Sequence, residues 1–301
     1  MKRVILTLAF LITALSLPSE SFAYTRIRLS HQVHNARSMS AAGNLVYYGG
    51  PVVSSTKVIT VFWGPAIDPA VKSKISGFYK TIVNSSYFDW LKEYNTTLNS
   101  QSGQKGTNQK IGRGTFGGEF TITPSFTANV IDDSNIRAEI TAQIQAKNLP
   151  AADDNSLYMI HFPKGSSITL PNGGSVATSC QDFCAYHNNF HMPDKQTVLY
   201  GVMPDLTDGI CPQGCGTNDT FGNTCAAASH EVVEATTDAL IGDVVGTTPI
   251  APLAWYDPSQ GEIGDICAGT QGNVIAADGT SYIVQGQWSN AQNACVTSPK
   301  N

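Results

Sequence analysis

His230, Glu231 and Glu234 form a stretch in which residue type and spacing together suggest chemistry. On an α-helix, His230 and Glu234 are one turn apart and point the same way, whereas Glu231 lies about 100° round the axis. An imidazole and a carboxylate so placed can bind a metal ion, and a second carboxylate beside them can take a proton from a water on that ion. We therefore predict His230 and Glu234 as metal ligands and Glu231 as a general base. The alternative is a solvated acidic helix face with an incidental histidine.

The segment around these residues is predicted to be a helix. It contains a run of alanines, its candidate N-caps are Asn223 and Thr224, and Gly242 is a candidate stop. Its apolar residues allow one side to pack against a core. The opposite face, which meets solvent or lines a cleft, carries His230, Glu231, Glu234 and Asp238. We expect Asp238 either to orient a ligand or to cap a neighbouring loop.

A later acidic group offers a third ligand. Glu262 and Asp265 are bracketed by Ile263, Ile266 and Cys267, which should hold them partly against the core. Buried carboxylates need partners. We predict Glu262 as the third metal ligand, with Asp265 next, and an ordinary solvated turn as the alternative.

This ligand set influences which metal is expected. One histidine with two carboxylates cancels the charge of a divalent ion, so a bound water should be less acidic than at a histidine-rich zinc site. Oxygen-rich sites also suit Ca²⁺ or Mn²⁺ better than nitrogen-rich ones do. A structural metal, or a site that has lost catalysis, is the alternative to hydrolysis.

Other histidines carry less weight. His187 and His191 are four apart near Cys184, which allows a second metal site, but a disulfide-rich surface loop explains them better. His161 lies in a predicted strand and is interpreted as a core or rim histidine.

The elements that must position these residues follow from hydrophobic pattern and turn signals. Asp68 and Pro69 open a helix with an apolar stripe, and Asp133 or Ser134 caps a second one. The segment between the third and fourth predicted strands is rich in Gly, Pro, Cys and His, and is interpreted as a disulfide-pinned excursion outside the core. Strands are predicted at residues 58–63, 115–123, 157–162, 197–203 and 282–288.

Charge and the N-terminal pattern bear on the compartment. The formal charge of -5 and pI near 5.6 argue against nucleic-acid or anionic-membrane partners. Residues 1–23 have a basic start, an apolar run too short to span a bilayer and small residues at Ser21 and Ala23, which is typical of a secretory signal peptide. Residues 24–45 are predicted to be a loose N-terminal arm and residues 46–301 a single domain. We expect a secreted monomer.

All seven cysteines lie in the C-terminal half, and in an exported protein disulfides are the default. We predict local bridges from Cys180 to Cys184 and from Cys211 to Cys215, because each pair is close in sequence. A third bridge is predicted between Cys267 and Cys295, which leaves Cys225 unpaired.

Two resemblances add to these interpretations. A His-Glu helix after an edge strand, with an acidic residue supplied later, resembles the zincin metallopeptidases, although Glu234 stands where zincins have a second histidine. Five motifs in order also resemble the secreted EXORDIUM, or phosphate-induced protein 1, family. These motifs are YYGGPV (47–52), FCAYH (183–187), CPQGC (211–215), SHEVVEATTD (229–238) and EIGDIC (262–267).

The resemblances imply a fold and a function. The zincin resemblance implies an α+β domain with a mixed sheet, an active-site helix and disulfide-pinned loops, zinc as the metal, and peptide-bond hydrolysis with Glu231 as base. The EXORDIUM resemblance implies export to an extracellular or cell-wall setting. We therefore predict a secreted metal-dependent peptidase, or a derived hydrolase, acting on an extracellular peptide or cell-wall substrate. The alternative is a non-catalytic cell-wall or glycan-associated binding protein on the same scaffold.

Overall fold

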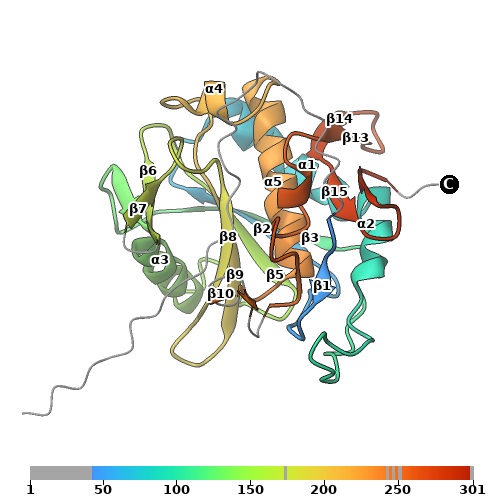
Figure 1. Ribbon diagram of the computed structural model, residues 1–301. Helices are drawn as coiled ribbons and strands as arrows, with labels where there is room; N and C mark the ends of the chain where they lie inside the picture. The colour runs from blue at the N-terminus through green and yellow to red at the C-terminus, as the bar shows by residue number, and fades with distance from the viewer. Residues whose placement is uncertain (1–42, 173–174, 242–243, 246–247, 250–252, 299–301) are drawn as a thin grey trace, which may run out of the picture.

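A computed structural model describes residues 43–172, 175–241, 244–245, 248–249 and 253–298. Its central sheet consists of β2 (Lys57–Trp63), β3 (Thr115–Ile122), β5 (Ser156–His161), β8 (Tyr186–His191) and β9 (Thr197–Met203). The strand order is β3-β2-β5-β9-β8 (Figure 1). β3, β2, β5 and β9 are parallel, and β8 is antiparallel to β9 at one edge.

The inner strands are apolar runs because both sheet faces are covered. Nearly every residue of β2, β5 and β9 is buried, as expected for parallel strands between two helical layers. The strands predicted from 58, 115, 157 and 197 onward are confirmed to within one residue at each end.

Three helices cover this sheet. They are α1 (Pro69–Ile82), α3 (Asp133–Gln145) and α5 (Thr220–Thr237). α1 and α5 pack into one apolar cluster and α3 into another, and the sheet strands contribute to both. The Asp68 side chain caps α1, as predicted. The cap of α3 is Asp132, one residue before the predicted Asp133 or Ser134.

α5 differs from its prediction in its ends and in its burial. Its N-cap is Asp219, whose side chain accepts from the backbone N–H of Gly222 at 2.6 Å, whereas Asn223 hydrogen-bonds to Asn218. The helix ends before Asp238, and Gly242 lies outside the described residues. Residues 222–237 are buried all round, so the alternative of a solvated acidic face is wrong.

The segment between β5 and β9 belongs to the body of the fold, contrary to the predicted excursion. It supplies β8 to the main sheet, and β6 (Ser167–Asn172) pairs with β7 (Ser175–Thr178) and with β4 (Val130–Asp132). The buried residues of this small sheet, such as Ile168 and Leu170, pack into the cluster that contains α3.

Short elements complete the chain. The predicted strand 282–288 is broken at Gly286 into two strands that belong to different sheets. The described chain further contains β1 (Val46–Tyr47), α2 (Ser86–Asp89), η1 (Trp90–Tyr94), α4 (Cys211–Gly214), β10 (Val244–Val245), β11 (Thr248–Pro249), β12 (Trp255–Tyr256), η2 (Asp265–Cys267), β13 (Gln271–Ile275), β14 (Ser281–Gln285), β15 (Gln287–Ser289) and β16 (Ala294–Val296).

The disulfides correct two predicted pairings. Cys180 bonds to Cys211 and Cys184 to Cys215, whereas Cys267–Cys295 and the free, buried Cys225 agree with prediction. Cys211 begins α4 and Cys215 is its C-cap, so the two cysteines are four residues apart and both point to one side of that single turn, toward the 180–184 segment. Two parallel bridges therefore fasten α4 to the chain that leads into β8.

The architecture is thus a mixed α/β fold with several sheets and three disulfides. The predicted signal peptide and most of the predicted arm, residues 1–42, lie outside the described residues. The last arm residue, Leu45, is buried at 2% exposure, and β1 pairs with β12. Within the described chain, every helix is too short or too polar to span a bilayer.

Candidate metal centre

His230, Glu231 and Glu234 project from the middle of α5 and are at most 1% exposed. Alanines at 226–228 let this helix lie close against the sheet. Gly201 of β9 lies opposite: a Cβ there would be 2.6 Å from Met159 Sδ and 3.9 Å from Glu231 Cβ. The small residues on α5 and on β9 therefore determine how closely the helix, and with it the functional side chains, approaches the sheet.

His230, Glu234 and Asp265 form a first group of ligand atoms. His230 Nε2 is 2.9 Å from Glu234 Oε2 and 3.9 Å from Asp265 Oδ1, and one atom from each residue lies within 4.8 Å of the others. Asp265 arrives from η2, and its side chain is 20% exposed. The structure thus brings together three of the predicted ligands.

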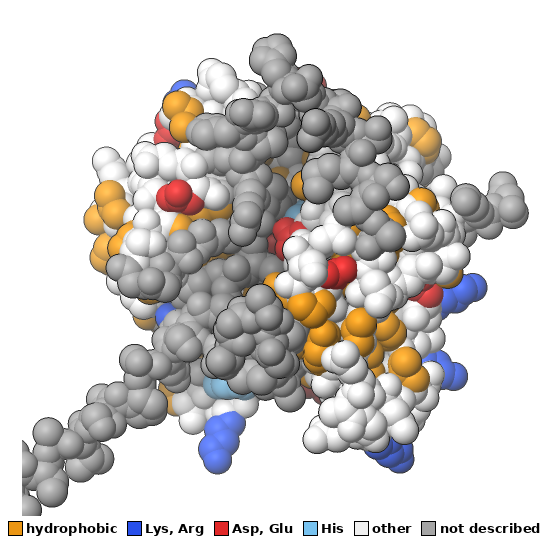
Figure 2. All heavy atoms as spheres, in the orientation of Figure 1, with side chains coloured by type: hydrophobic (Ala, Val, Ile, Leu, Met, Phe, Trp, Pro, Cys, Tyr) orange, Lys and Arg blue, Asp and Glu red, His pale blue; other side chains and the backbone are white. Residues whose placement is uncertain are grey.

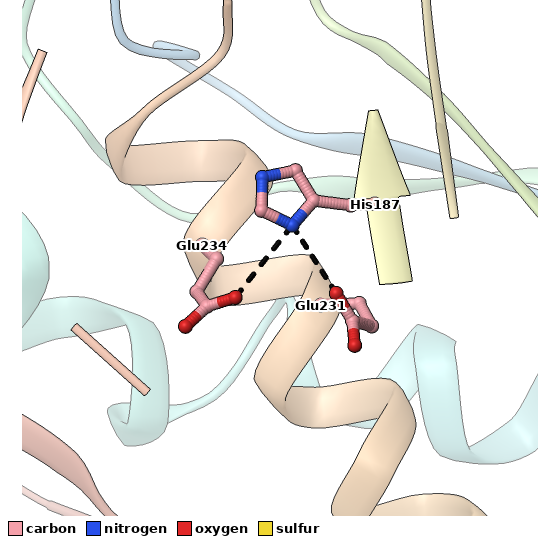
Figure 3. A group of neighbouring side chains, drawn as sticks. All are labelled: His187, Glu231 and Glu234. Carbon is pink, nitrogen blue, oxygen red and sulfur yellow. Dashed lines mark hydrogen bonds and ion pairs between the residues drawn. The ribbon is translucent and has the colours of Figure 1, made fainter. Parts of the chain in front are cut away.

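His187, Glu231 and Glu234 form a second group, drawn in Figure 3. The imidazole reaches over from β8 toward two carboxylates on adjacent turns of α5. His187 Nδ1 is 3.1 Å from Glu231 Oε2 and 3.6 Å from Glu234 Oε2. The cross-strand partner of His187 is Gly201, so no side chain beside it on that face separates it from the helix. The Glu234 carboxylate is common to both groups.

Glu262, the first choice for the third ligand, lies elsewhere in the cluster. It is 1% exposed, and its Oε1 is 3.7 Å from His187 Nε2. The two ligand groups found among the described residues do not include it. The His187 ring therefore lies between Glu262 on one side and Glu231 and Glu234 on the other.

A turn at residues 262–265 orients the first group. The backbone N–H groups of Gly264 and Asp265 both donate to Glu234 Oε1 at 3.2 Å, which leaves Oε2 directed toward His230. The Gln285 amide contacts His230 Nδ1 at 2.8 Å and donates to the Gly264 carbonyl at 2.8 Å. Gln285 therefore links the imidazole to the same turn, and the other ring nitrogen, Nε2, faces the carboxylates.

Gly264 is required by this close approach. A Cβ at this position would lie 2.6 Å from His230 Nδ1 and 2.9 Å from Glu234 Oε1. The backbone conformation, with φ -82° and ψ -37°, is open to any residue, so the restriction is purely one of space.

Several buried polar atoms at this site have no hydrogen-bond partner among the described residues. They include His230 Nε2, Glu234 Oε2 and Glu231 Oε1. The first two face each other at 2.9 Å as an ion pair, and neither has a hydrogen-bond partner in any other described group. Lone pairs that converge in a buried place are the arrangement a cation requires, so these residues fit a divalent metal.

The cluster also perturbs its own proton affinities. Burial foremost, and then the Glu234 charge, raises the pKa of Asp265 to about 8 against the opposing effect of His230. Burial alone lowers the pKa of His230, but Glu234 and the other carboxylates outweigh it and raise that pKa to about 10. Burial likewise raises the pKa of Glu231. In the described part of the chain, Glu231, Glu234 and Asp265 form ion pairs with imidazoles and with no lysine or arginine.

Two roles were predicted for Asp238, orienting a ligand or capping a neighbouring loop, and the structure shows the capping contact. Asp238 ends α5, and its Oδ1 accepts from the backbone N–H of Ala254 at 2.8 Å. Burial raises its pKa well above the ordinary value. Asp238 thereby links the end of α5 to the residue just before β12, the strand that precedes the acidic turn.

The remaining histidines of the described chain differ in their burial and in their contacts. His187 is in the cluster, so its interpretation as part of a surface loop is wrong, whereas His191 is exposed and contacts Thr197. His161 is a core histidine whose Nε2 is 2.9 Å from the Tyr79 hydroxyl, and burial lowers its pKa to about 3. Residues 186–191, Tyr-His-Asn-Asn-Phe-His, do not alternate between apolar and polar side chains, and their burial does not alternate either, so no local pattern assigns His187 to a strand.

Acidic and histidine side chains are visible together in a hollow near the middle of the face shown in Figure 2. Comparison of the chain with protein-family models, with curated proteins and with solved structures finds no match. The site is therefore characterised by its own geometry: a buried histidine and carboxylate cluster that could hold a metal ion.

Proposed function

We propose that the chain is a secreted metal-dependent peptidase with a zincin-like core. The observation that carries this proposal is the convergence of His230 Nε2 and Glu234 Oε2, without hydrogen-bond partners, next to Asp265 in a buried place. His230, Glu234 and Asp265 would hold the metal. Asp265 replaces Glu262 as the preferred third ligand because it is the carboxylate within reach of His230.

A bound divalent ion would supply an acidified water and polarise a carbonyl group. Glu231 is the group that receives the proton. Its Oε2 is held by His187 Nδ1 at 3.1 Å, and its Oε1 has no hydrogen-bond partner among the described residues. Because burial raises its pKa, Glu231 can hold a proton closer to neutral pH and pass it to a leaving amine.

The metal and the compartment are part of the same proposal. Zinc is favoured by the zincin resemblance, while the carboxylate-rich ligand set makes Mn²⁺ and Ca²⁺ competitors. Three disulfides and the lack of a membrane-spanning helix among the described residues are compatible with an extracellular protein. The substrate class is an extracellular peptide or a cell-wall component.

Deep burial of the ligands favours a second candidate function, in which the metal is structural. His187, His230 and Glu234 are each at most 1% exposed, which suits a structural metal. In that case the chain is a cell-wall or glycan-associated binding protein, and the resemblance to the EXORDIUM family supports the same setting.

The Glu231→Gln variant distinguishes the two candidates. The mature protein is purified, its metal content is measured by elemental analysis, and cleavage is followed on a peptide library. A peptidase should retain the metal held by His230, Glu234 and Asp265, a group that does not contain Glu231, and should lose cleavage by about 10²–10⁴-fold when the base is removed. A binding protein should show no cleavage in either form. The matched control is Glu119→Gln, which changes an exposed glutamate on β3. The metal-binding premise is refuted if no stoichiometric metal is found and chelators leave the melting temperature unchanged.

A further inference from the structure

We propose that the cluster holds two divalent cations that share the Glu234 carboxylate. One lies in the group His230, Glu234 and Asp265, and the other in the group His187, Glu231 and Glu234. In the second group Glu231 would bind through Oε2, the oxygen next to His187 Nδ1, which leaves Oε1 as the oxygen that accepts the proton. The inference rests on the proposed metal binding and deepens it by naming a second cation.

The ligand geometry divides into two groups rather than one. Donor atoms bound to one tetrahedral ion at about 2.1 Å are roughly 3.4 Å apart. The first group has separations of 2.9 and 3.9 Å from His230 Nε2, and the second has 3.1 and 3.6 Å from His187 Nδ1. Each imidazole belongs to one group only, and Glu234 belongs to both. A carboxylate that bridges two ions about 3.5–4 Å apart is the usual centre of a two-metal site.

The contacts at the far side of each ring support this division. On His230, the Gln285 amide contacts Nδ1 and leaves Nε2 toward Glu234 and Asp265. On His187 the arrangement is reversed: Nε2 faces Glu262 at 3.7 Å, and Nδ1 points to the second group. The orientation of a metal-bound imidazole is fixed by contacts to its other nitrogen, which here are the Gln285 amide nitrogen at His230 Nδ1 and the Glu262 carboxylate at His187 Nε2. Glu262 is thus assigned the role of positioning His187.

Two divalent ions match the charge of the four carboxylates when all of them are ionised. Glu231, Glu234, Glu262 and Asp265 carry a formal charge of -4 when ionised, and three of them are at most 1% exposed. With neutral imidazoles, one divalent cation leaves -2 in a buried site and two leave zero. Uncompensated buried charge is costly, so a fully ionised cluster favours the second cation.

Metal stoichiometry tests the inference. The mature protein is loaded with Zn²⁺ or Mn²⁺ alone, passed through a desalting column and analysed for metal per chain, and calorimetric titration gives the number of binding sites. We expect two equivalents for the wild type, one for His187→Ala and one for Asp265→Ala. The matched control is His191→Ala, an exposed histidine on the same strand, which should keep two.

Three results overturn the inference in different ways. One equivalent in the wild type that His187→Ala leaves unchanged refutes the second cation but preserves the peptidase proposal. One equivalent in the wild type that is lost in both His187→Ala and Asp265→Ala means that a single ion uses ligands from both groups, which also refutes it. No bound metal refutes both proposals. Should His187→Ala fail to fold, the Mn²⁺-loaded wild type decides by electron paramagnetic resonance, since two bridged ions give a coupled spectrum and one ion does not.

Discussion

Replacement of Gly264 by alanine tests whether the acidic turn positions the metal ligands. The added Cβ would lie 2.6 Å from His230 Nδ1, whereas ordinary contact begins at 3.4 Å, so ring and turn must separate by at least the 0.8 Å difference. The same Cβ would lie 2.9 Å from Glu234 Oε1. Because the backbone φ of -82° suits alanine, the substitution adds crowding without backbone strain.

The size of the effect follows from this displacement. Overpacking of a buried site costs about 1–3 kcal/mol, which lowers the melting temperature by roughly 2–12 °C for a domain of this size. Disturbing the groups that hold a ligand weakens metal binding by about 10–100-fold. We therefore expect both a lower melting temperature and weaker Zn²⁺ binding in Gly264→Ala.

The assay is calorimetric titration with Zn²⁺, together with thermal unfolding with and without chelator. Gly112→Ala is the matched control, because a Cβ there is 3.8 Å from its nearest neighbour, the Ser54 carbonyl oxygen. Gly264→Ala protein with wild-type Zn²⁺ affinity would show that the turn does not position the ligands, and would refute the reasoning.

Three further predictions concern the same centre. Because Asp265 and His230 both have folded-state pKa values above their ordinary values of 3.8 and 6.5, the folded chain without metal binds more protons than the unfolded chain. Above about pH 6.5 the buried His161 is neutral in both states and does not oppose this effect, so the melting temperature should fall from there to about pH 10. The increase given by added Zn²⁺ should grow over that range; a flat profile contradicts this. Gln285→Leu should weaken Zn²⁺ binding by about 10–100-fold, because it removes the amide nitrogen that contacts His230 Nδ1 and donates to the Gly264 carbonyl; wild-type Zn²⁺ affinity in this variant, measured by calorimetric titration, contradicts the positioning role. Loss of the Cys184–Cys215 bridge in the double serine variant should lower the free energy of unfolding by about 2–4 kcal/mol, as measured by chemical denaturation. It should also reduce the metal content found by elemental analysis; an unchanged metal content would show that this bridge does not help to position the site.

Local patterns account for the parts of the fold that were predicted correctly. Asp68 followed by Pro69 starts α1 because the Asp68 side chain caps free backbone N–H groups and the proline ring presets φ. The apolar runs of β2, β5 and β9 likewise indicate buried strands, because an uninterrupted series of apolar side chains is expected where both faces of a strand are covered. These features depend on neighbours in sequence, so no knowledge of the folded chain was needed.

The disulfides show where such reasoning ends. Closeness in sequence favoured pairing Cys180 with Cys184, yet each bonds across to α4. Which thiols meet depends on how two separate segments dock, and the spacing within either segment contains no information about that. Only the pair that joins residues 267 and 295 was predicted correctly.

The sequence by itself determined the helical spacing of His230, Glu231 and Glu234, since that spacing is a property of the α-helix. It also indicated that a later acidic turn would supply a carboxylate. Only the tertiary structure decided that Asp265 faces His230, that Glu262 faces His187, and that His187 belongs to the centre at all. The physical reason is that these contacts depend on the register of an edge strand and on the docking of a turn, and both are set by packing over the whole molecule.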